Sequence, residues 1–444
     1  MKENKKVLII AGVGAVVVLA LILGVIVSWI GRSGGSGTIP ELPDNQLLAP
    51  GDLVLEDGIL SYGEVEGADY YLINVASLEE LQTENASVDI NESLLSFFGV
   101  GTITVTAVDE SGEFANSSTS LTIERNGLFN QYGVLIATYK ELVEKHNLDI
   151  TGKLDDGALL KNVIRELGAA SYTDMKFVVA EGVREIGDGA FADITSLSKI
   201  YLPSTIERIG KNPVAGCKFL EEIIVSTNNA KYGIEAKALY EKESGLLIAY
   251  PAFAGIKDVV IPDCITAIGD QAFYWMSGVE KIVMSDGVIS IGDSAFMYSA
   301  ALTEVVLGDS VIEIGENAFS SCANLKSIDL GKSLKEIGER AFLRCLSLEN
   351  IVLPDTLEKI NPYAFSYCTR LKNIVLPTAL NYIGANAFSN CPELSVKSME
   401  ITGWRAMHLS GTQKGVELDG ILTVENAGEF LSKNYVGYQW RKER

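Results

Sequence analysis

The chain has 444 residues, more than one ordinary domain contains, and 47% are hydrophobic, which argues against global disorder. Its formal net charge is -22 at pH 7, and it shows no basic stripe, so we expect no nucleic-acid partner. His146 and His408 are its two histidines, which argues against histidine-based catalysis and histidine-ligated metals.

The first residues differ in kind from the rest. Three lysines lie within residues 1–6, and residues 7–30 are an unbroken run of 24 apolar or small residues. As a helix this run is roughly 36 Å long, enough to cross about 30 Å of hydrocarbon. We predict a cytoplasmic tail at 1–6, a single-pass transmembrane helix at 7–30 and an extracellular remainder. The alternative is a cleaved signal peptide, whose apolar region is shorter and ends in a small-residue site that is absent here.

Residues 31–51 are rich in glycine, serine and then proline, which predicts a flexible tether. Residues 52–125 alternate in the manner of short strands, with Gly, Asp and Ser at the turns. The phrases "LSYGEVEGADYYLINV" and "ITVTAVDESG" resemble fibronectin type III modules, although Tyr62 stands where the module has Trp and Ile103 where it has Tyr. The resemblance implies an Ig-like β-sandwich.

Residues 126–174 are predicted to form a helical N-terminal cap. One apolar stripe at helical spacing, followed by Gly168 as a C-cap, comprises Leu159, Leu160, Val163, Ile164 and Leu167. A solenoid needs such a cap because its end rung exposes a hydrophobic cross-section.

From residue 175 the sequence is periodic. Strand-like hexamers begin at 175, 198, 221, 257, 280, 303, 326, 349, 372 and 395, so every interval is 23 residues except one of 36. A fixed period of about 20–29 residues with Leu-x-x-Ile-x-Leu predicts a mainly β, leucine-rich repeat solenoid of about ten rungs over residues 175–400.

The 23-residue unit has a physical interpretation. Leu325, Ile328 and Leu330 point inward from a turn and a strand, and Ile337 supplies an inward residue on the return side. The Ala-Phe pair that includes Phe319 places one small and one large residue on the back wall, so that successive phenylalanines stack. Each rung is unstable alone, and stacking buries a continuous core.

Two further segments interrupt or end the repeats. Near residues 227–256, the runs "KALY" and "LLIAYP" flank "EKESG" and predict a β-hairpin insertion. Residues 401–444 read as a strand, a short helix and a Trp-containing end, which we interpret as a C-terminal cap.

The phrase L-x-x-I-x-L-P-x-x-L-x-x-I-G-x-x-A-F-x-x-C resembles the BspA-like, or Treponema-type, leucine-rich repeats of bacterial surface proteins. The resemblance covers about residues 175–397. It implies a cell-surface protein with adhesion or protein binding as its function, and it names no ligand.

A cysteine follows the phenylalanine of several rungs by three residues. The cysteines in this phase are Cys217, Cys322, Cys345, Cys368 and Cys391, and Ile194, Met276 and Ser299 fill the phase elsewhere. Neither Ile nor Met replaces a thiolate ligand, so we expect a buried column of small side chains and no metal. A disulfide between neighbouring rungs stays open, because rungs stack about 4.8 Å apart. Cys264 is out of phase.

No enzyme motif appears in the chain. It lacks G-x-S-x-G, a phosphate-binding G-x-x-x-x-G-K-[ST] loop and an EF-hand loop, and its acidic residues fall at turns where solvation explains them. We therefore expect no catalytic residues and no cofactor.

One residue of each rung strand points outward between two inward residues. With Val178 and Asp329, this outward column comprises Tyr201, Ile224, Val260, Val283, Val306, Val352 and Val375. These seven are the candidate partner-binding residues, a hydrophobic band rimmed by the polar residues two positions earlier. The alternative is β-propensity, since exposed strands favour β-branched residues that shield one another.

The sequence thus predicts a membrane-anchored, extracellular, non-enzymatic binding or adhesion protein of a bacterial surface. Its expected partner is a host matrix protein or an envelope protein, recognised through the repeat-domain sheet. The alternatives are a scaffold or sensor for other envelope proteins and a carbohydrate-binding envelope module.

Overall fold

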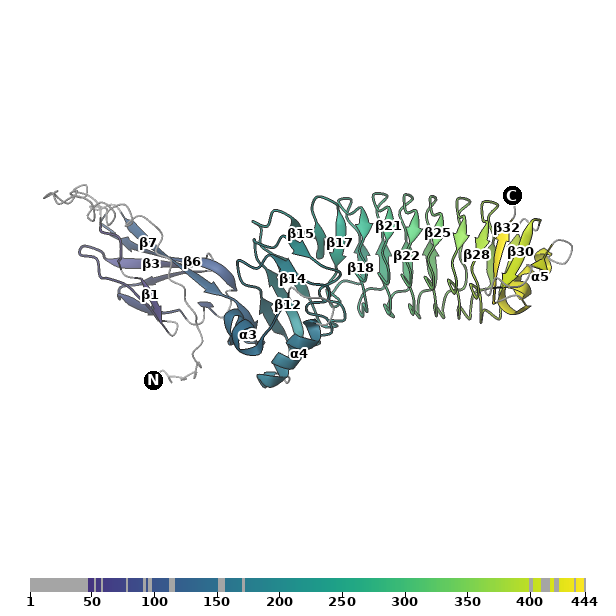
Figure 1. The fold of residues 1–444 in the computed structure, drawn as a ribbon. Helices are drawn as coiled ribbons and strands as arrows, with labels where there is room; N and C mark the ends of the chain where they lie inside the picture. The colour runs from purple at the N-terminus through teal and green to yellow at the C-terminus, as the bar shows by residue number, and fades with distance from the viewer. Residues whose placement is uncertain are drawn as a thin grey trace, which may run out of the picture. The chain divides into compact units, whose positions relative to one another are not determined.

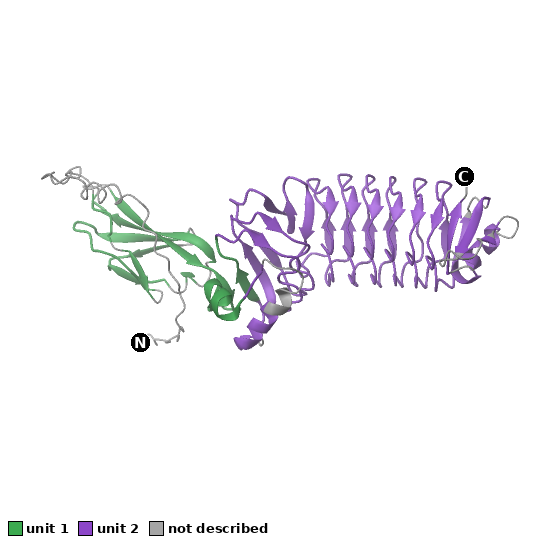
Figure 2. Ribbon diagram, viewed as in Figure 1, with its two compact units in different colours: residues 1–147, 175–181 green, residues 148–174, 182–444 purple. Residues whose placement is uncertain are grey.

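The computed structural model describes residues 47–51, 53–56, 59–76, 79–90, 93–94, 98–111, 116–150, 156–169, 172–398, 402–408, 416–418, 423–434 and 437–442 (Figure 1). The chain divides into two compact units (Figure 2). The N-terminal unit comprises residues 1–147 and 175–181, and the repeat unit comprises residues 148–174 and 182–444.

The predicted transmembrane helix at residues 7–30 lies outside the described residues, as do the tail at 1–6 and most of the tether. Within the described ranges, no helix combines the length and apolar character needed to cross a membrane. The anchor stays a prediction.

The N-terminal unit contains two antiparallel sheets. One has the order β1-β2-β5 and the other β4-β3-β6-β7. The strands are β1 (Val54–Glu56), β2 (Ile59–Ser61), β3 (Tyr70–Val75), β4 (Glu79–Thr83), β5 (Ser87–Asp89), β6 (Gly99–Val108) and β7 (Ser117–Arg125). Leu60 of the first sheet and Ile73 of the second belong to one buried cluster, as the alternation of these strands requires.

Both departures from the fibronectin pattern lie in this core. Ile103 is fully buried. Tyr62 is buried against Tyr71, with ring centroids 4.8 Å apart, and its hydroxyl donates to the Asn85 carbonyl at 2.8 Å. Burial raises the pKa of Tyr62 to about 12. A hydrogen-bonded tyrosine therefore fills a core position where the module has tryptophan.

The segment predicted as an all-helical cap contains strands as well. It comprises β8 (Gly127–Phe129), β9 (Leu135–Thr138), α3 (Tyr139–His146) and, in the repeat unit, α4 (Asp156–Glu166). Gly127 permits the close approach of β8 and β9, because its φ is 126° and an added Cβ would lie 2.1 Å from the Ala137 carbonyl oxygen of β9. Helix α3 begins only at the capping box between Thr138 and Glu141. In α4, the stripe residues Leu160, Val163 and Ile164 are buried.

Parallel strands form the solenoid of about ten turns in the repeat unit. The first row comprises β12 (Leu197–Leu202), β14 (Glu222–Val225), β18 (Asp258–Val260), β20 (Lys281–Val283), β22 (Glu304–Val306), β24 (Ser327–Asp329), β27 (Asn373–Val375) and β29 (Ser395–Ser398). Its predicted starts agree with these bounds. The rung at 349 contributes a single parallel bridge, Asn350 to Asn373.

The second row lies on the return side. It comprises β11 (Glu185–Ile186), β13 (Arg208–Ile209), β19 (Ala267–Ile268), β21 (Ser290–Ile291), β23 (Glu313–Ile314), β25 (Glu336–Ile337), β26 (Lys359–Ile360) and β28 (Tyr382–Ile383). Neighbours pair in parallel with partners 23 residues apart, as in Ile314 with Ile337. The isoleucines of this row are buried in the core, except Ile209 of β13, which is half-buried.

The strand expected to open the solenoid has an antiparallel partner that the period does not predict. Strand β10 (Met175–Val178) lies in the N-terminal unit, where it pairs antiparallel with β8. Val178 is 1% exposed, which corrects its place in the outward column. Sequence periodicity alone could not reveal this antiparallel partner.

Three antiparallel strands occupy the long interval between rungs. They are β15 (Tyr232–Glu235), β16 (Ala238–Glu241) and β17 (Leu246–Ala249), and β17 then pairs in parallel with β19. The insertion is thus a three-stranded meander, one strand more than the hairpin read from the sequence. It returns the chain to the second row.

The predicted phenylalanine stack is confirmed. Rings of neighbouring rungs from Phe273 to Phe388 lie 4.8–5.3 Å apart and within 17° of parallel, and Tyr250 extends the stack at 5.0 Å. The corner glycines serve the same close stacking, since a Cβ on Gly338 would lie 2.5 Å from the Gly315 carbonyl.

The C-terminal segment closes the stack. Its elements are β30 (Trp404–His408), β31 (Val416–Glu417), α5 (Val424–Glu429), η2 (Phe430–Asn434) and β32 (Tyr438–Lys442). Strand β32 pairs antiparallel with β28, which ends the parallel row. Trp404 and Trp440 are buried, with ring centroids 6.4 Å apart. They cover apolar cross-section that the last rungs would otherwise expose.

The cysteine column is buried and hydrogen-bonded. The Sγ of Cys322, Cys345, Cys368 and Cys391 donates at 3.1–3.2 Å to the carbonyl of a phenylalanine 26 residues earlier. Ser299 makes the same bond at 2.8 Å, so a hydroxyl can replace the thiol here, whereas Ile194 and Met276 fill the phase without a donor. Burial raises the pKa of Cys322 and of Cys391 to about 12. All six cysteines are free thiols in the structure.

This arrangement predicts unequal thiol reactivity. In the native protein a thiol reagent should modify Cys264, which is exposed, and should reach the five buried thiols only after unfolding. Cys345→Ala should lower the free energy of unfolding by about 1–2 kcal/mol, because it leaves a small cavity and removes the thiol's hydrogen bond to the Phe319 carbonyl. Cys345→Ser, which keeps a donor as Ser299 does, is the matched control. Reaction of two or more thiols in the native state would contradict this account of the column.

Candidate binding surfaces of the repeat unit

The outward column follows the strand faces as predicted. Val260, Val283 and Val306 lie opposite one another on three consecutive strands of the parallel sheet, and Asp329 continues their row on β24. The flanking residues Val305 and Leu307 are buried, at 0% and 3% exposure. The inward and outward faces are therefore assigned correctly.

Exposure varies along the column. Val352 is 82% exposed, Val260 65% and Val375 48%, whereas Val283 and Val306 are half-buried between their neighbours. Tyr201 and Ile224 are also half-buried and lie opposite each other on β12 and β14. The structure thus divides the seven candidates into three groups: a pair on β12 and β14, a row of three valines, and Val352 with Val375 beyond Asp329.

Ion pairs between rungs line one side of this column. Lys199 binds Glu222 at 2.8 Å, and Lys281 binds Glu304 at 2.7 Å. The hydrogen bond to Glu222 raises the pKa of Lys199, and that to Glu304 raises the pKa of Lys281. Exposed pairs contribute little stability. They make the edge of the outward column polar.

A second surface was missed by sequence reasoning. In the motif Ile-Gly-x-x-Ala-Phe-x-x-Cys, the residue before Ala-Phe and the second residue after it adopt left-handed backbone conformations in rung after rung. The residues with φ between 56° and 63° include Ser294, Tyr298, Asn317, Ser321, Arg340, Arg344, Tyr363, Tyr367, Asn386 and Asn390. We call this face of the solenoid the left-handed face.

Backbone hydrogen bonding explains these conformations. The N–H groups of Asn317, Phe319 and Ser321 donate to carbonyls of the next rung, at 2.7–2.8 Å. The alternate N–H groups of Ala318 and Ser320 donate within their own rung. Because successive N–H groups donate alternately to the next rung and to their own rung, the backbone donors of this segment are satisfied without a regular strand. It also makes the side chains before and after each Ala-Phe pair project outward in two columns.

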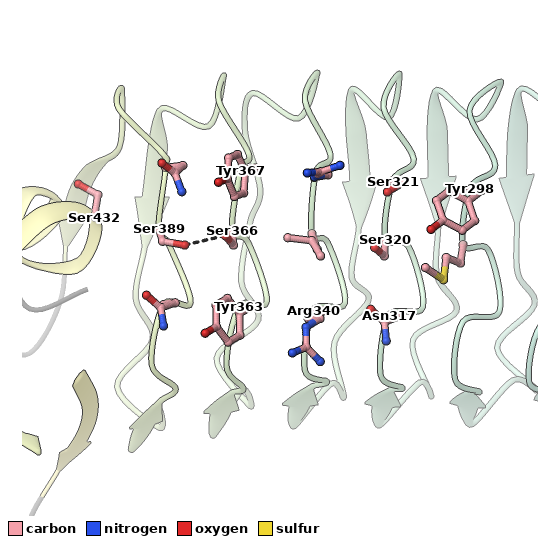
Figure 3. Close-up of a pocket in the computed structure, with 15 residues that line it drawn as sticks. Tyr298, Asn317, Ser320, Ser321, Arg340, Tyr363, Ser366, Tyr367, Ser389 and Ser432 are labelled. Carbon is pink, nitrogen blue, oxygen red and sulfur yellow. Dashed lines mark hydrogen bonds between the residues drawn. The ribbon is translucent and has the colours of Figure 1, made fainter. Parts of the chain in front are cut away.

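A groove of about 620 Å³ lies between the two columns (Figure 3). Its floor carries the small side chains Ser320, Ser366 and Ser389, and Ser366 and Ser389 share a hydrogen bond of 2.6 Å. The remaining lining residues are Met297, Tyr298, Asn317, Ser321, Arg340, Leu343, Arg344, Tyr363, Tyr367, Asn386, Asn390 and Ser432. Ser432 comes from η2 of the C-terminal segment.

Arginines lie over tyrosines of the adjacent rung in both columns. The guanidinium of Arg340 lies 5.2 Å from the centroid of Tyr363, and that of Arg344 lies 5.6 Å from the centroid of Tyr367. Arg340 also pairs with Glu339 at 2.6 Å and with Glu316 at 3.5 Å. Among the described residues, Arg344 forms no ion pair. The groove thus offers aromatic faces, amides, hydroxyls and one uncompensated guanidinium.

These surfaces are suited to binding. Within the described ranges, no group of three or more His, Cys, Asp or Glu side chains is placed to hold a metal ion. In the sequence, the groove is marked only by Tyr, Arg and Asn at two variable positions of the motif. These positions share no residue type and follow no apolar period, so the repeat pattern did not reveal them.

Comparison with known proteins identifies the repeat. Residues 168–244, 248–303 and 289–403 match, in six copies, the family described as the BspA type leucine rich repeat region. A comparison with curated proteins found no match. The match begins at residue 168, so the fibronectin type III-like module at 52–125 stays a prediction.

Several solved structures are similar. A leucine-rich repeat protein from Eubacterium ventriosum is 23% identical, with TM-score 0.43, covering 57% of this chain and 68% of that chain. A leucine-rich cell surface protein from Faecalibacterium prausnitzii is 28% identical, with TM-score 0.40, covering 47% and 61%. A leucine-rich repeat protein from Bacteroides ovatus is 32% identical, with TM-score 0.39, covering 50% and 60%. This chain therefore spans about three-fifths of the latter two.

The family match extends over more than half of the 444 residues. It coincides with the 23-residue period, the stacked phenylalanines and the parallel rows of the repeat unit. The chain belongs to the BspA-type leucine-rich repeat family.

Proposed function

We propose that this chain is a membrane-anchored extracellular binding protein of a bacterial cell surface, which recognises a protein partner through the first-row sheet of its solenoid. The observation that carries the proposal is the continuous row Val260, Val283 and Val306, together with the exposed Val352 and Val375 beyond Asp329. An apolar centre beside a polar edge is the usual anatomy of a protein interface.

The second row of the same solenoid argues against β-propensity as the full explanation. Its outward residues, on strands with the same parallel geometry, are Ala267, Ser290, Glu313, Glu336, Lys359 and Tyr382. If strand preference alone selected side chains, valine would recur in both rows. It recurs only in the first, which favours a binding role for that face.

The proposed organisation follows the chain. A tail at 1–6 and a transmembrane helix at 7–30 anchor the protein, and a tether at 31–51 leads to a sandwich at 52–125. A cap at 126–174 precedes the solenoid at 175–400, which carries its insertion near 227–256 and ends at a cap at 401–444. Family membership supports placement at the cell surface, where a solenoid on a spacer reaches partners outside the cell.

The topology has its own test. The protein should stay with membranes in a carbonate wash, and external protease should cut it on intact cells, because the lysines at 1–6 favour a cytoplasmic N-terminus. Sequencing of the N-terminus completes the measurement. A mature chain that starts near Ser33 would show that the apolar run is a cleaved signal.

The binding face is tested by a charge on the valine row. Val306→Arg should abolish binding of the partner while the free energy of unfolding changes by roughly 1 kcal/mol or less, since the site is partly exposed. Leu307→Arg, one residue along and buried, should unfold the local rungs. Crosslinking on intact cells and on host matrix, with mass spectrometry, identifies the partner; circular dichroism follows folding.

Ser290→Arg, on the second row, is the matched control and should bind as the parent does. Loss of binding in both variants would assign the effect to charge in general, and unchanged binding by Val306→Arg would reject the valine row as the interface. Crosslinking to envelope proteins of the same cell, with none to host proteins, would favour the scaffold or sensor role.

A further inference from the structure

The residue types on the left-handed face run against backbone preference. Left-handed conformations suit Gly, Asn and Asp, and strain larger side chains. Gly189, Asp193 and Gly216 hold such positions in the first rungs of the repeat unit. Around the groove the same conformation is held by Tyr298, Arg340, Arg344, Tyr363 and Tyr367. Large side chains that are kept in strained backbone conformations indicate positions where the side chain has a functional role.

We propose that this groove binds an acidic oligosaccharide, a glycan chain whose sugar rings carry carboxylates. The site is separate from the valine row, and the ligand belongs to a different chemical class from the protein partner proposed above.

Aromatic faces supply the first part of the argument. Tyr298 and Tyr367 are 38% and 43% exposed, and they stand in the same column three rungs apart, about 15 Å at the usual strand spacing. Arg344 lies over Tyr367 and Trp275 packs against Tyr298, and the aromatic surface that both tyrosines leave exposed suits the apolar C–H face of a sugar ring. A series of such contacts along the solenoid axis fits a chain of sugars better than a single compact molecule.

Polar groups supply the second part. Asn317, Asn386 and Asn390 present amides along the groove, and serine hydroxyls line its floor, as a ligand rich in hydroxyl groups requires. Ser432, a residue of η2, lies at one end of the groove (Figure 3). The space of about 620 Å³ is open to solvent along the face, so the ends of a chain can extend beyond it.

Charge selects the ligand within this class. The protein carries -22 overall, yet the lining of the groove includes two arginines and no acidic residue. Glu316 and Glu339 compensate Arg340, whereas Arg344 keeps its charge for a ligand. The planar fork of arginine matches a carboxylate through two parallel hydrogen bonds.

The test uses the full-length protein, a glycan array with acidic and neutral oligosaccharides, and calorimetric titration with hyaluronan hexasaccharide. We expect acidic glycans to bind in preference to neutral ones, and affinity to fall with added salt. Tyr367→Asn and Arg344→Asn should each weaken binding at least tenfold. Because Asn suits the left-handed conformation, as Asn390 shows in the next rung, the melting temperature of each variant should match or exceed the parent's.

Controls separate this site from general effects. Gln271→Asn changes a left-handed residue outside the groove, at φ 58°, and should leave glycan binding unchanged, as should Val306→Arg on the valine row. Absence of any acidic glycan among the array hits would overturn the proposal. So would equal binding by Tyr367→Asn and the parent, or preference for a poly-glutamate peptide over hyaluronan. A fall in melting temperature in both Asn variants with unchanged affinity would assign the arginine–tyrosine contacts to stability alone.

Discussion

A register of 23 residues between neighbouring rungs is the constraint on which the repeat unit depends. The parallel pairs of both rows keep it, as in Val283 with Val306 and Ile314 with Ile337. The phenylalanine rings stack at 4.8–5.3 Å because of it, and the cysteine thiols reach the carbonyls of the preceding rung. No rung has a core of its own, so the packing that stabilises the solenoid is made between rungs.

The same register arranges the surface. A residue that points outward in one rung meets its counterpart in the next about 4.8 Å away, so a preference at one motif position becomes a continuous column. The valine row and the two columns of the left-handed face arise in this way. Substitution at these variable positions therefore changes the outward surface while the core positions stay as they are.

Sequence reasoning succeeded where one residue type repeats. The strand starts, the inward isoleucines and the stack through Phe319 follow from period and hydrophobicity. It failed where the decisive fact is a backbone conformation or a distant partner. The left-handed positions of Tyr363 and Arg344 share no residue type, the pairing of β10 with β8 is antiparallel and outside the period, and Gly127 gave no local sign of its contact with β9.

Deletion of one rung tests the register most directly. Removal of residues 326–348, one full period of 23, joins Leu325 to Glu349 and brings Phe319 into phase with Phe365. The register account predicts a folded protein that melts cooperatively close to the parent's temperature. Removal of residues 327–348, one residue fewer, should shift inward side chains outward and lower the melting temperature sharply. Equal melting of the two deletions would contradict the account.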